Sequence, residues 1–310
     1  MVPEGGRGLL VGLELRGEVK VPPHMGQGGF DHGDVYQPNG LVFVAHTANG
    51  TIEVIDGEAL QHVATIPECR EGSGVICPTG ADLVIAAARG AGEVLFIDPA
   101  ELAVVGRVSV GGRPNGLAWD SRRGRVLVAD VAGNSFSLVD AAGQRIVGAA
   151  ALPGRPRWTI YDAEHDQFLV NIRDPAAVAV VDPEAATVRA IWSVSCRGPH
   201  GLDLDRAGGR AFVACDGGEM VCLSSVDGTE VAKVAIAGVP DAIWFNPAAS
   251  SLYAAIAEPG VLQVVDTNRM AIAEAIKTEP GAQTTALDLR RQAFYVFQPI
   301  TCSVTAFRIV

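Results

Sequence analysis

The sequence predicts an all-β protein, a seven-bladed β-propeller whose last blade is closed by the N-terminal strand, and three observations predict it. An aspartate that ends an apolar run recurs in steps of 42 residues, at Asp56, Asp98, Asp140 and Asp182. Each repeat holds four short, β-branched runs bounded by turn residues, which is the composition of a propeller blade. The last repeat has only three such runs, and a fourth stands alone at residues 17–21.

The repeats divide the chain into seven expected blades within one domain, residues 1–310. Each blade opens with a turn rich in glycine and proline, such as Gly112-Arg113-Pro114. Pairing the run at 17–21 with the last blade would close the ring and leave no unpaired sheet edge. A β-helix, the alternative, has shorter and more uniform coils. The expected bounds are 28–67, 68–110, 111–152, 153–194, 195–236, 237–278, and 279–310 together with 7–22.

Composition narrows the classes of partner. The 310 residues carry 24 Lys and Arg against 35 Asp and Glu, a net charge of -11. An acidic protein gains little from counterion release, so we expect no nucleic-acid partner. The sequence has no apolar run long enough for a membrane span, and we expect no membrane partner. We expect a monomer or weak oligomer.

The start of the chain lacks the charged and apolar regions of a secretory signal peptide, so we expect a cytoplasmic protein, with a trimmed periplasmic signal left open. The six cysteines form no CxxC pair, and we expect most of them to be reduced. Cys215 and Cys222 could face each other across a hairpin and form a disulfide.

The repeat has a recognisable set of residues: a Gly- or Arg-x-Pro opening, a second strand of the type Leu127-Val128-Ala129-Asp130, and the apolar run that ends in aspartate. In these features essentially the whole chain resembles the YVTN family of β-propeller repeats, which includes YncE-like proteins. The resemblance implies the fold but leaves the function open, because family members bind protein partners or nucleic acid or have no known activity. At a looser level the fold is similar to that of gluconolactonases and paraoxonase-like enzymes, which implies a divalent metal held in the central channel by Asp, Glu and Asn.

Seven polar residues are expected to form a ring at one mouth of the channel, because the first strand of each blade lines it. They share one position of the repeat, directly after the opening turn. They are Asp31, Ser73, Asn115, Arg157, His200, Asp241 and Gln283. A solvated turn would reuse a few small polar residues, so this diversity indicates a functional site.

Within this ring we expect Asp31, Asn115 and Asp241 to bind a divalent metal ion. Oxygen ligands favour Ca²⁺, Mg²⁺ or Mn²⁺, and added histidines would favour Zn²⁺. The expected catalytic residues are His200 or His32 as general base and Arg157 as the group that stabilises developing negative charge. The expected substrate-binding residues are Trp158, His46, Gln283 and Asp130.

This set of residues predicts a metal-assisted hydrolase of the lactonase, esterase or phosphotriesterase kind, acting on a small molecule. A lyase could use the same site. The alternatives are a propeller that binds a small ligand without catalysis, or one that binds another protein. No GxSxG, HExxH or Walker A motif is present, but a propeller site is assembled from separate loops and needs no local motif.

Overall fold

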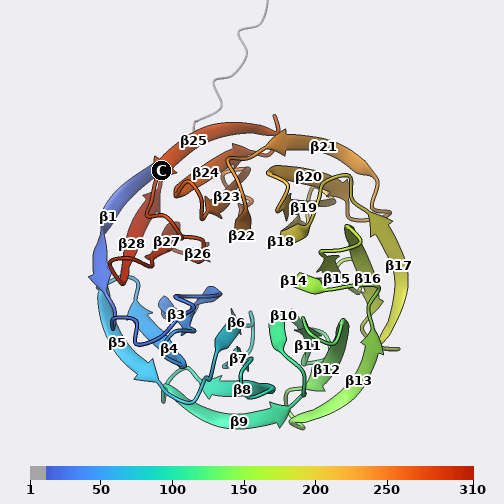
Figure 1. The fold of residues 1–310 in the computed structure, drawn as a ribbon, viewed down its shortest axis with the longest axis horizontal. Helices are drawn as coiled ribbons and strands as arrows, with labels where there is room; N and C mark the ends of the chain where they lie inside the picture. Colours follow the sequence, from blue (N-terminus) through green and yellow to red (C-terminus); the bar gives the residue numbers. More distant parts are fainter. Residues whose placement is uncertain (1–11) are drawn as a thin grey trace, which may run out of the picture.

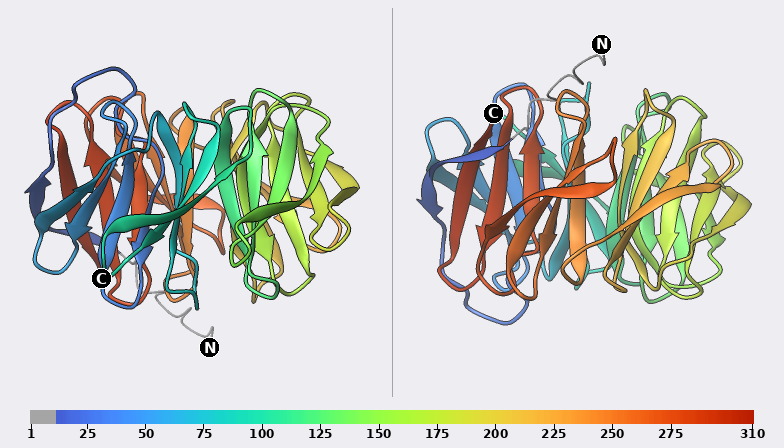
Figure 2. Two further views of the ribbon diagram at one scale, coloured as in Figure 1. Left: turned by 90° about the horizontal axis from the view of Figure 1, so that it is seen from below. Right: turned by 90° about the horizontal axis from the view of Figure 1, so that it is seen from above.

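The computed structural model of the protein describes residues 12–310, which form 28 β-strands in seven four-stranded sheets. Viewed along the channel, the sheets stand as blades around a central axis (Figure 1). Side views show a short, thick disc (Figure 2). The predicted all-β, seven-bladed propeller is confirmed. Residues 12–310 contain no helix that could span a membrane.

The blades share one antiparallel order, from an inner strand on the channel to an outer strand on the perimeter. The inner strands are β2 (Gly33–Tyr36), β6 (Gly72–Ile76), β10 (Pro114–Asp120), β14 (Pro156–Asp162), β18 (Pro199–Asp205), β22 (Pro240–Asn246) and β26 (Thr285–Asp288). The second strands are β3 (Leu41–His46), β7 (Val84–Ala88), β11 (Arg125–Asp130), β15 (Gln167–Ile172), β19 (Arg210–Cys215), β23 (Ser251–Ile256) and β27 (Ala293–Gln298). The third strands are β4 (Thr51–Asp56), β8 (Glu93–Asp98), β12 (Ser135–Asp140), β16 (Ala177–Asp182), β20 (Glu219–Ser224), β24 (Val261–Asp266) and β28 (Ser303–Ile309). The outer strands are β5 (Gln61–Ile66), β9 (Ala103–Ser109), β13 (Arg145–Ala151), β17 (Thr187–Ser193), β21 (Glu230–Ala235), β25 (Ala271–Lys277) and β1 (Leu13–Lys20).

The N-terminal strand closes the ring, as the sequence predicts. β1 pairs antiparallel with β28, with Val19 opposite Val304, and the sheet order is β1-β28-β27-β26. The strand begins at Leu13, earlier than the predicted run at 17–21. Residues 7–11 of the predicted closing segment lie outside the described part of the chain. Both ends of the described chain are therefore tied into one sheet.

The core consists of seven apolar layers, each between two neighbouring blades. Phe43 of β3 and Leu95 of β8, for example, belong to one layer between the first two blades. Second and third strands are buried on both faces, whereas outer strands such as β9 alternate between more and less exposed residues. Blade packing thus holds the inner strands in fixed positions around the channel.

The recurring aspartates are turn residues. The Oδ1 atom of Asp56 accepts hydrogen bonds from the backbone N–H groups of Glu58 and Ala59, at 2.9 and 2.8 Å. Asp98 makes the same pair of bonds with Ala100 and Glu101. These bonds tighten the turn that leads from the third to the fourth strand, so the 42-residue signal has a structural cause.

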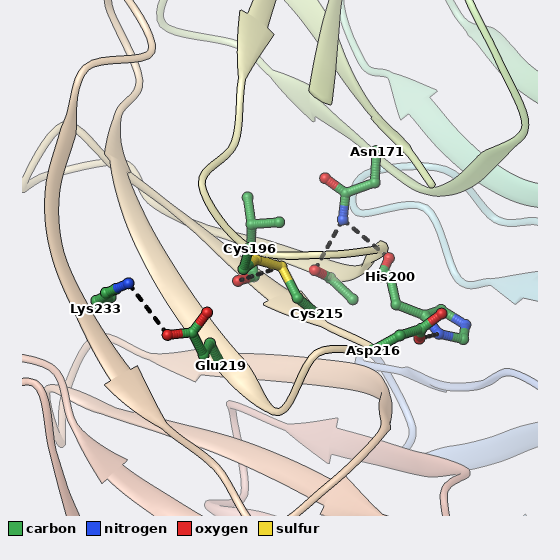
Figure 3. Close-up of a disulfide and its surroundings, with 9 residues drawn as sticks. Asn171, Cys196, His200, Cys215, Asp216, Glu219 and Lys233 are labelled. Atoms are coloured by element: carbon green, nitrogen blue, oxygen red, sulfur yellow. Dashed lines mark hydrogen bonds and ion pairs between the residues drawn. A yellow bond between two sulfur atoms is a disulfide. The ribbon is translucent and has the colours of Figure 1, made fainter. Parts of the chain in front are cut away.

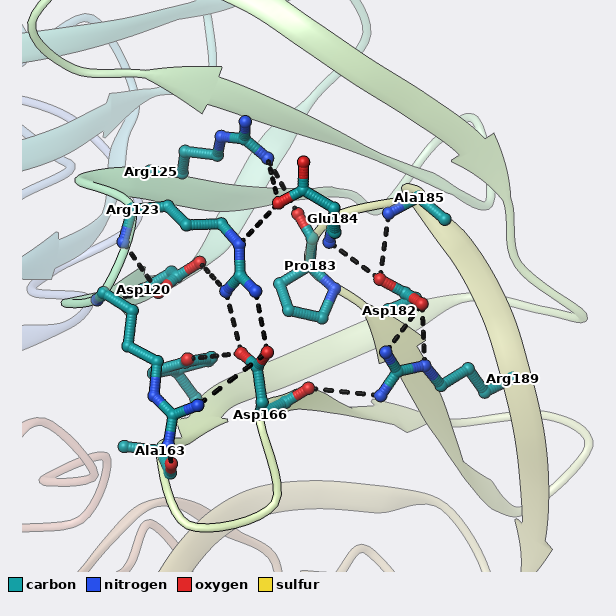
Figure 4. Close-up of polar contacts among 12 residues, drawn as sticks. Asp120, Arg123, Arg125, Ala163, Asp166, Asp182, Pro183, Glu184, Ala185 and Arg189 are labelled. Atoms are coloured by element: carbon teal, nitrogen blue, oxygen red, sulfur yellow. Dashed lines mark hydrogen bonds and ion pairs between the residues drawn. The ribbon is translucent and has the colours of Figure 1, made fainter.

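Polar contacts also join neighbouring blades at their rims (Figure 4). The guanidinium group of Arg123 contacts Asp120 of its own blade at 3.0 Å and reaches Asp166 and Glu184 of the next blade, each at 2.7 Å. Arg123 and Tyr161 both donate hydrogen bonds to Asp166 and lower the pKa of that carboxyl, although burial opposes the shift. This contact supplements the apolar layer between the two blades.

Candidate functional site

The ring residues reach the channel mouth because the inner strands are irregular there. In five blades the register between the first two strands shifts at the ring position, as between Pro114 and Leu117 around Asn115. Such a shift is a β-bulge, which re-aims the side chain that it contains. In four of these five blades the preceding residue is a proline, which has no N–H to donate to the sheet and so favours the irregularity.

A cavity of about 230 Å³ lies at this mouth, and six of the seven ring residues line it. We call it the mouth cavity. It is lined by Asp31, His32, Arg89, Asn115, Arg157, Trp158, His200, Asp241 and Gln283. The seventh ring residue, Ser73, is fully buried and donates a hydrogen bond to the carbonyl oxygen of Pro114 instead. The repeat spacing therefore identified a group of residues that the fold brings together.

Carboxylates and imidazoles alternate across the mouth cavity. His200 Nε2 lies 3.2 Å from Asp241 Oδ1, and His32 Nε2 lies 3.9 Å from the same oxygen. His32 Nε2 is also 3.3 Å from Asp31 Oδ1. On the other side, His200 Nδ1 lies 2.8 Å from Asp216 Oδ1. The series runs from blade one through blade six to blade five, so its geometry depends on the closed ring.

His200 lies between two carboxylates, and this sets its charge. Burial opposes protonation of the imidazole, but Asp241 and Asp216 outweigh burial and raise the pKa of His200 to about 9. An ionised carboxylate can only accept hydrogen bonds, so both ring nitrogens of His200 face acceptors and carry protons. His200 is therefore an imidazolium ion at neutral pH in the metal-free protein.

The two carboxyls of the mouth cavity titrate differently. Burial penalises the charged form of Asp241, but His200 and His32 overcome this and lower its pKa to about 2. At Asp31 burial dominates and raises the pKa, although His32 and Arg89 oppose the shift. Asp241 is thus the fixed negative charge of the cavity, and its two imidazole partners come from two different blades.

Two arginines add positive charge to the cavity wall. Arg89 Nη2 lies 3.4 Å from Asp31 Oδ2, whereas no hydrogen-bond partner for the Nε atoms of Arg89 and Arg157 is found among residues 12–310. Burial is the main cause that lowers the pKa of Arg157, and the charge of Arg155 adds to it. Each guanidinium group therefore retains a buried donor for a ligand.

The donor set fits a divalent metal ion. One ligand atom from each of Asp31, His32 and Asp241 lies within 4.8 Å of the others, the one such group in the described chain. Asn115 lines the same cavity with 7% of its surface exposed, and its amide oxygen is a further oxygen donor there. Two of the three ligands predicted from sequence, Asp31 and Asp241, are in this group, and His32 joins them.

Trp158 and Gln283 line the mouth cavity, as expected of substrate-binding residues, and the ring of Trp158 lies against His32 with centroids 4.2 Å apart. Asp130 lies outside the cavity and accepts hydrogen bonds from the backbone N–H groups of Arg113 and Ala132.

His46 also lies outside the cavity. It is fully buried, with its ring nitrogens 3.0 Å from Glu53 Oε1 and 2.7 Å from His24 Nδ1. Burial penalises the charged form of Glu53, but its bonds to His46, Thr65, Thr51 and His62 lower its pKa to about 2. His46 is therefore occupied by a structural contact of the first blade.

A disulfide between Cys196 and Cys215 lies on the His200 side of the mouth cavity (Figure 3). It joins the loop that leads to His200 with the end of β19, next to Asp216. The suggested Cys215–Cys222 pairing was wrong, because Cys215 lies opposite Glu219 in the hairpin and Cys222 lies opposite Phe212.

Asn171 holds the start of β18, since its amide donates to the carbonyl oxygens of His200 and Gly201 at 3.0 and 2.9 Å. Asp216 and Arg89 directly follow the ends of the second strands β19 and β7. Their roles depend on side-chain direction: Asp216 contacts His200, and Arg89 contacts Asp31.

Comparison with protein-family models and with curated protein sequences finds no match. Among solved structures, the chain is similar to one described as Kuenenia stuttgartiensis hydrazine synthase, with a TM-score of 0.81 and 12% sequence identity. The alignment covers 92% of this chain and 97% of the other. At this identity the likeness shows the propeller fold alone.

Proposed function

We propose that the mouth cavity binds a divalent metal ion and that the protein is a metal-assisted hydrolase of esters, lactones or phosphate esters. The observation that carries the proposal is the group of ligand atoms from Asp31, His32 and Asp241, with the amide of Asn115 in the same cavity lining. Three oxygen donors and one imidazole suit Mg²⁺, Mn²⁺ or Ca²⁺, and Zn²⁺ is the alternative.

A bound metal ion would polarise the scissile group and make water a better nucleophile. The protein residues then divide the remaining work. His200, held at Nδ1 by Asp216, would donate a proton to the leaving oxygen, a role that differs from the general base expected from sequence. Arg157 would stabilise the negative charge that develops on the substrate. Trp158 would pack against the apolar part of the substrate.

The mouth favours substrates that carry negative charge. A hollow beside the mouth cavity is lined by Arg155, Arg173 and Arg197, and Asp216 borders it. Arg173 Nε lies 2.8 Å from Asp216 Oδ2, so this arginine also orients the partner of His200. In a protein of net charge -11 a local concentration of arginines would attract an anionic substrate.

A second candidate is binding of a small anion without catalysis. It is favoured by the buried Nε donors of Arg89 and Arg157, which have no partner among residues 12–310. The resemblance of the repeat residues to the YVTN family is compatible with either function.

The test is thermal unfolding with EDTA and with Mg²⁺, Mn²⁺, Ca²⁺ or Zn²⁺. A metal present at a hundred times its Kd should stabilise the fold by about 2.7 kcal/mol. Asp241→Asn should remove this shift, and Asp98→Asn, a change in an exposed turn, should retain it. His200→Gln should keep the metal-dependent shift and lose ester hydrolysis. If none of the four metals changes the melting temperature, the metal site is refuted, and stabilisation by inorganic phosphate alone would support anion binding.

A further inference from the structure

A second cavity, of about 380 Å³, lies along the inner strands beyond the mouth cavity. It includes residues from the far ends of these strands and from the turns that follow them, such as Ser121 and Ala163. Three of the four tryptophans in the chain line it, Trp119, Trp158 and Trp244. We call it the tryptophan cavity. His32 and Trp158 line both cavities and form the wall between them.

Two carboxylates, Asp34 and Asp203, line the tryptophan cavity. They occupy the same repeat position, three residues after Asp31 and His200 of the mouth ring. The other five blades have an apolar residue there: Ile76, Ala118, Ile160, Trp244 and Ala286. Both carboxylates keep part of their surface open to the cavity although protein surrounds them. Two blades therefore place a charge where the repeat otherwise places apolar surface.

Each carboxylate also joins neighbouring blades. Asp34 accepts hydrogen bonds from the N–H groups of Val35 and Cys77, at 2.7 and 2.8 Å. Asp203 does the same with Leu204 and Phe245, at 2.7 and 2.6 Å. A purely structural role would account for these bonds. It would not account for the charge, because five blades pack on their neighbours without a carboxylate at this position.

Neither carboxylate has a salt-bridge partner in the described chain. Arg206 borders the cavity, but its guanidinium group donates to the carbonyl oxygen of Tyr161 at 3.1 Å. Burial raises the pKa of Asp203 to about 6, and Arg206 opposes this shift only in part. Neither carboxylate is therefore neutralised by an ion pair, and a bound cation would stabilise both.

The lining of the tryptophan cavity also contains a hydroxyl group without a hydrogen-bond partner in the described chain. Thr159 is 3% exposed and lines the cavity, and its Oγ1 atom has no hydrogen-bond partner among residues 12–310. A buried hydroxyl without a partner is costly, and a ligand N–H or O–H group would satisfy it. The half-buried tryptophan rings offer π faces that attract cations.

We propose that the tryptophan cavity binds a monovalent organic cation, an ammonium group on a small apolar body. The carboxylates supply the counter-charge, the tryptophans pack against the cation, and Thr159 accepts a hydrogen bond from a ligand N–H or O–H group. A bare metal ion fits poorly, because it needs several free oxygen ligands and the carboxylate oxygens here already accept backbone bonds. The proposal does not rest on the metal proposed for the mouth cavity, although His32 lines both cavities.

The experiment measures binding of choline, tetramethylammonium and benzyltrimethylammonium by tryptophan fluorescence and calorimetry, with EDTA present. We expect at least one to bind. The matched control for choline is its neutral isostere 3,3-dimethylbutan-1-ol, which should bind more than about tenfold more weakly because it lacks the charge. Equal affinity for this pair, or no binding of any of the three cations, overturns the proposal.

Variants localise the site. Trp119→Leu should weaken cation binding more than about tenfold, and Trp119→Phe should retain most of it, since phenylalanine keeps a π face. Asp34→Asn should weaken cation binding and leave the neutral isostere unaffected, while Asp98→Asn should change neither. Melting temperatures establish that each variant is folded. Undiminished binding in both Trp119→Leu and Asp34→Asn would place the ligand elsewhere and refute the proposal.

Discussion

The mouth cavity and the tryptophan cavity are adjacent parts of one channel, yet their carboxylates are stabilised in opposite ways. In the mouth cavity Asp241 lies between His200 and His32, and opposite charges lower its pKa to about 2. In the tryptophan cavity Asp34 has backbone N–H partners but no ion pair in the described chain, and burial raises its pKa to about 7.

This difference shows that burial alone does not decide the charge of a carboxyl group. The inner strand produces both environments within a few residues. At the ring position a β-bulge turns polar side chains toward one another, so opposite charges meet. Three residues later the regular pleat continues, and the neighbours are apolar or aromatic. The mouth cavity is therefore arranged for internal pairing, and the tryptophan cavity is arranged to be completed by a ligand.

The largest effect should follow removal of the shared carboxylate of the mouth cavity. Asp241→Ala leaves His200 and His32 without their common partner, and breaking a buried pair in this way should cost about 3–5 kcal/mol of unfolding free energy. Urea unfolding measures the loss. Choline binding at the tryptophan cavity should persist in folded Asp241→Ala. A tenfold loss of choline affinity would mean that the two cavities act as one site and are not separate.

The next largest loss of unfolding free energy should follow removal of the disulfide, which lies beside the mouth cavity and not beside the tryptophan cavity. Cys215→Ser opens the disulfide to Cys196, and closing a loop of this length contributes about 3 kcal/mol. Unfolding by urea should show this loss in Cys215→Ser, in Cys196→Ser and in the double variant alike, since all three lack the same bond.

Cys222→Ser is the matched control, because Cys222 is buried in the same blade but free. A loss in Cys222→Ser equal to that in Cys215→Ser would assign the effect to packing. The disulfide is also typical of an oxidising compartment, so it bears on the cytoplasmic location expected from the sequence, which stays a prediction.

The repeat residues predicted the architecture because each blade obeys the same local rules. Turn aspartates, Gly/Pro openings and β-branched runs all recur, and packing between blades does not alter them. The same spacing predicted six of the residues that meet in the mouth cavity, including His200 and Asp241. Shifting it by three positions would have identified Asp34 and Asp203.

Side-chain direction and partners between blades could not be predicted in this way. His46 occupies a strand end like Asp130, but its ring points to Glu53 and His24 and not to the cavity. The pairing of Cys196 with Cys215 depends on where the loop before His200 passes β19, and hairpin register alone suggested another partner.

The smallest effect is a pH dependence that should separate the two cavities. The folded protein holds protons on Asp34 and Asp203 more tightly than the unfolded chain, because their pKa values are raised to about 7 and about 6. The unfolding free energy therefore falls as pH rises from about 4 to about 7, and a bound cation should offset this loss. Choline should accordingly raise the melting temperature at about pH 8 and bind about tenfold more weakly near pH 5.

The other ionisable groups on the cavity wall are His32, Cys77, Tyr161 and Arg206. Burial raises the pKa of Cys77 and of Tyr161, so neither loses a proton in this range. His32→Gln tests the remaining group and should preserve the pH dependence. Choline affinity that is equal at both pH values would show that the carboxylates do not hold the cation. Loss of the pH dependence in His32→Gln would show that His32, and not the carboxylates, is the group that titrates.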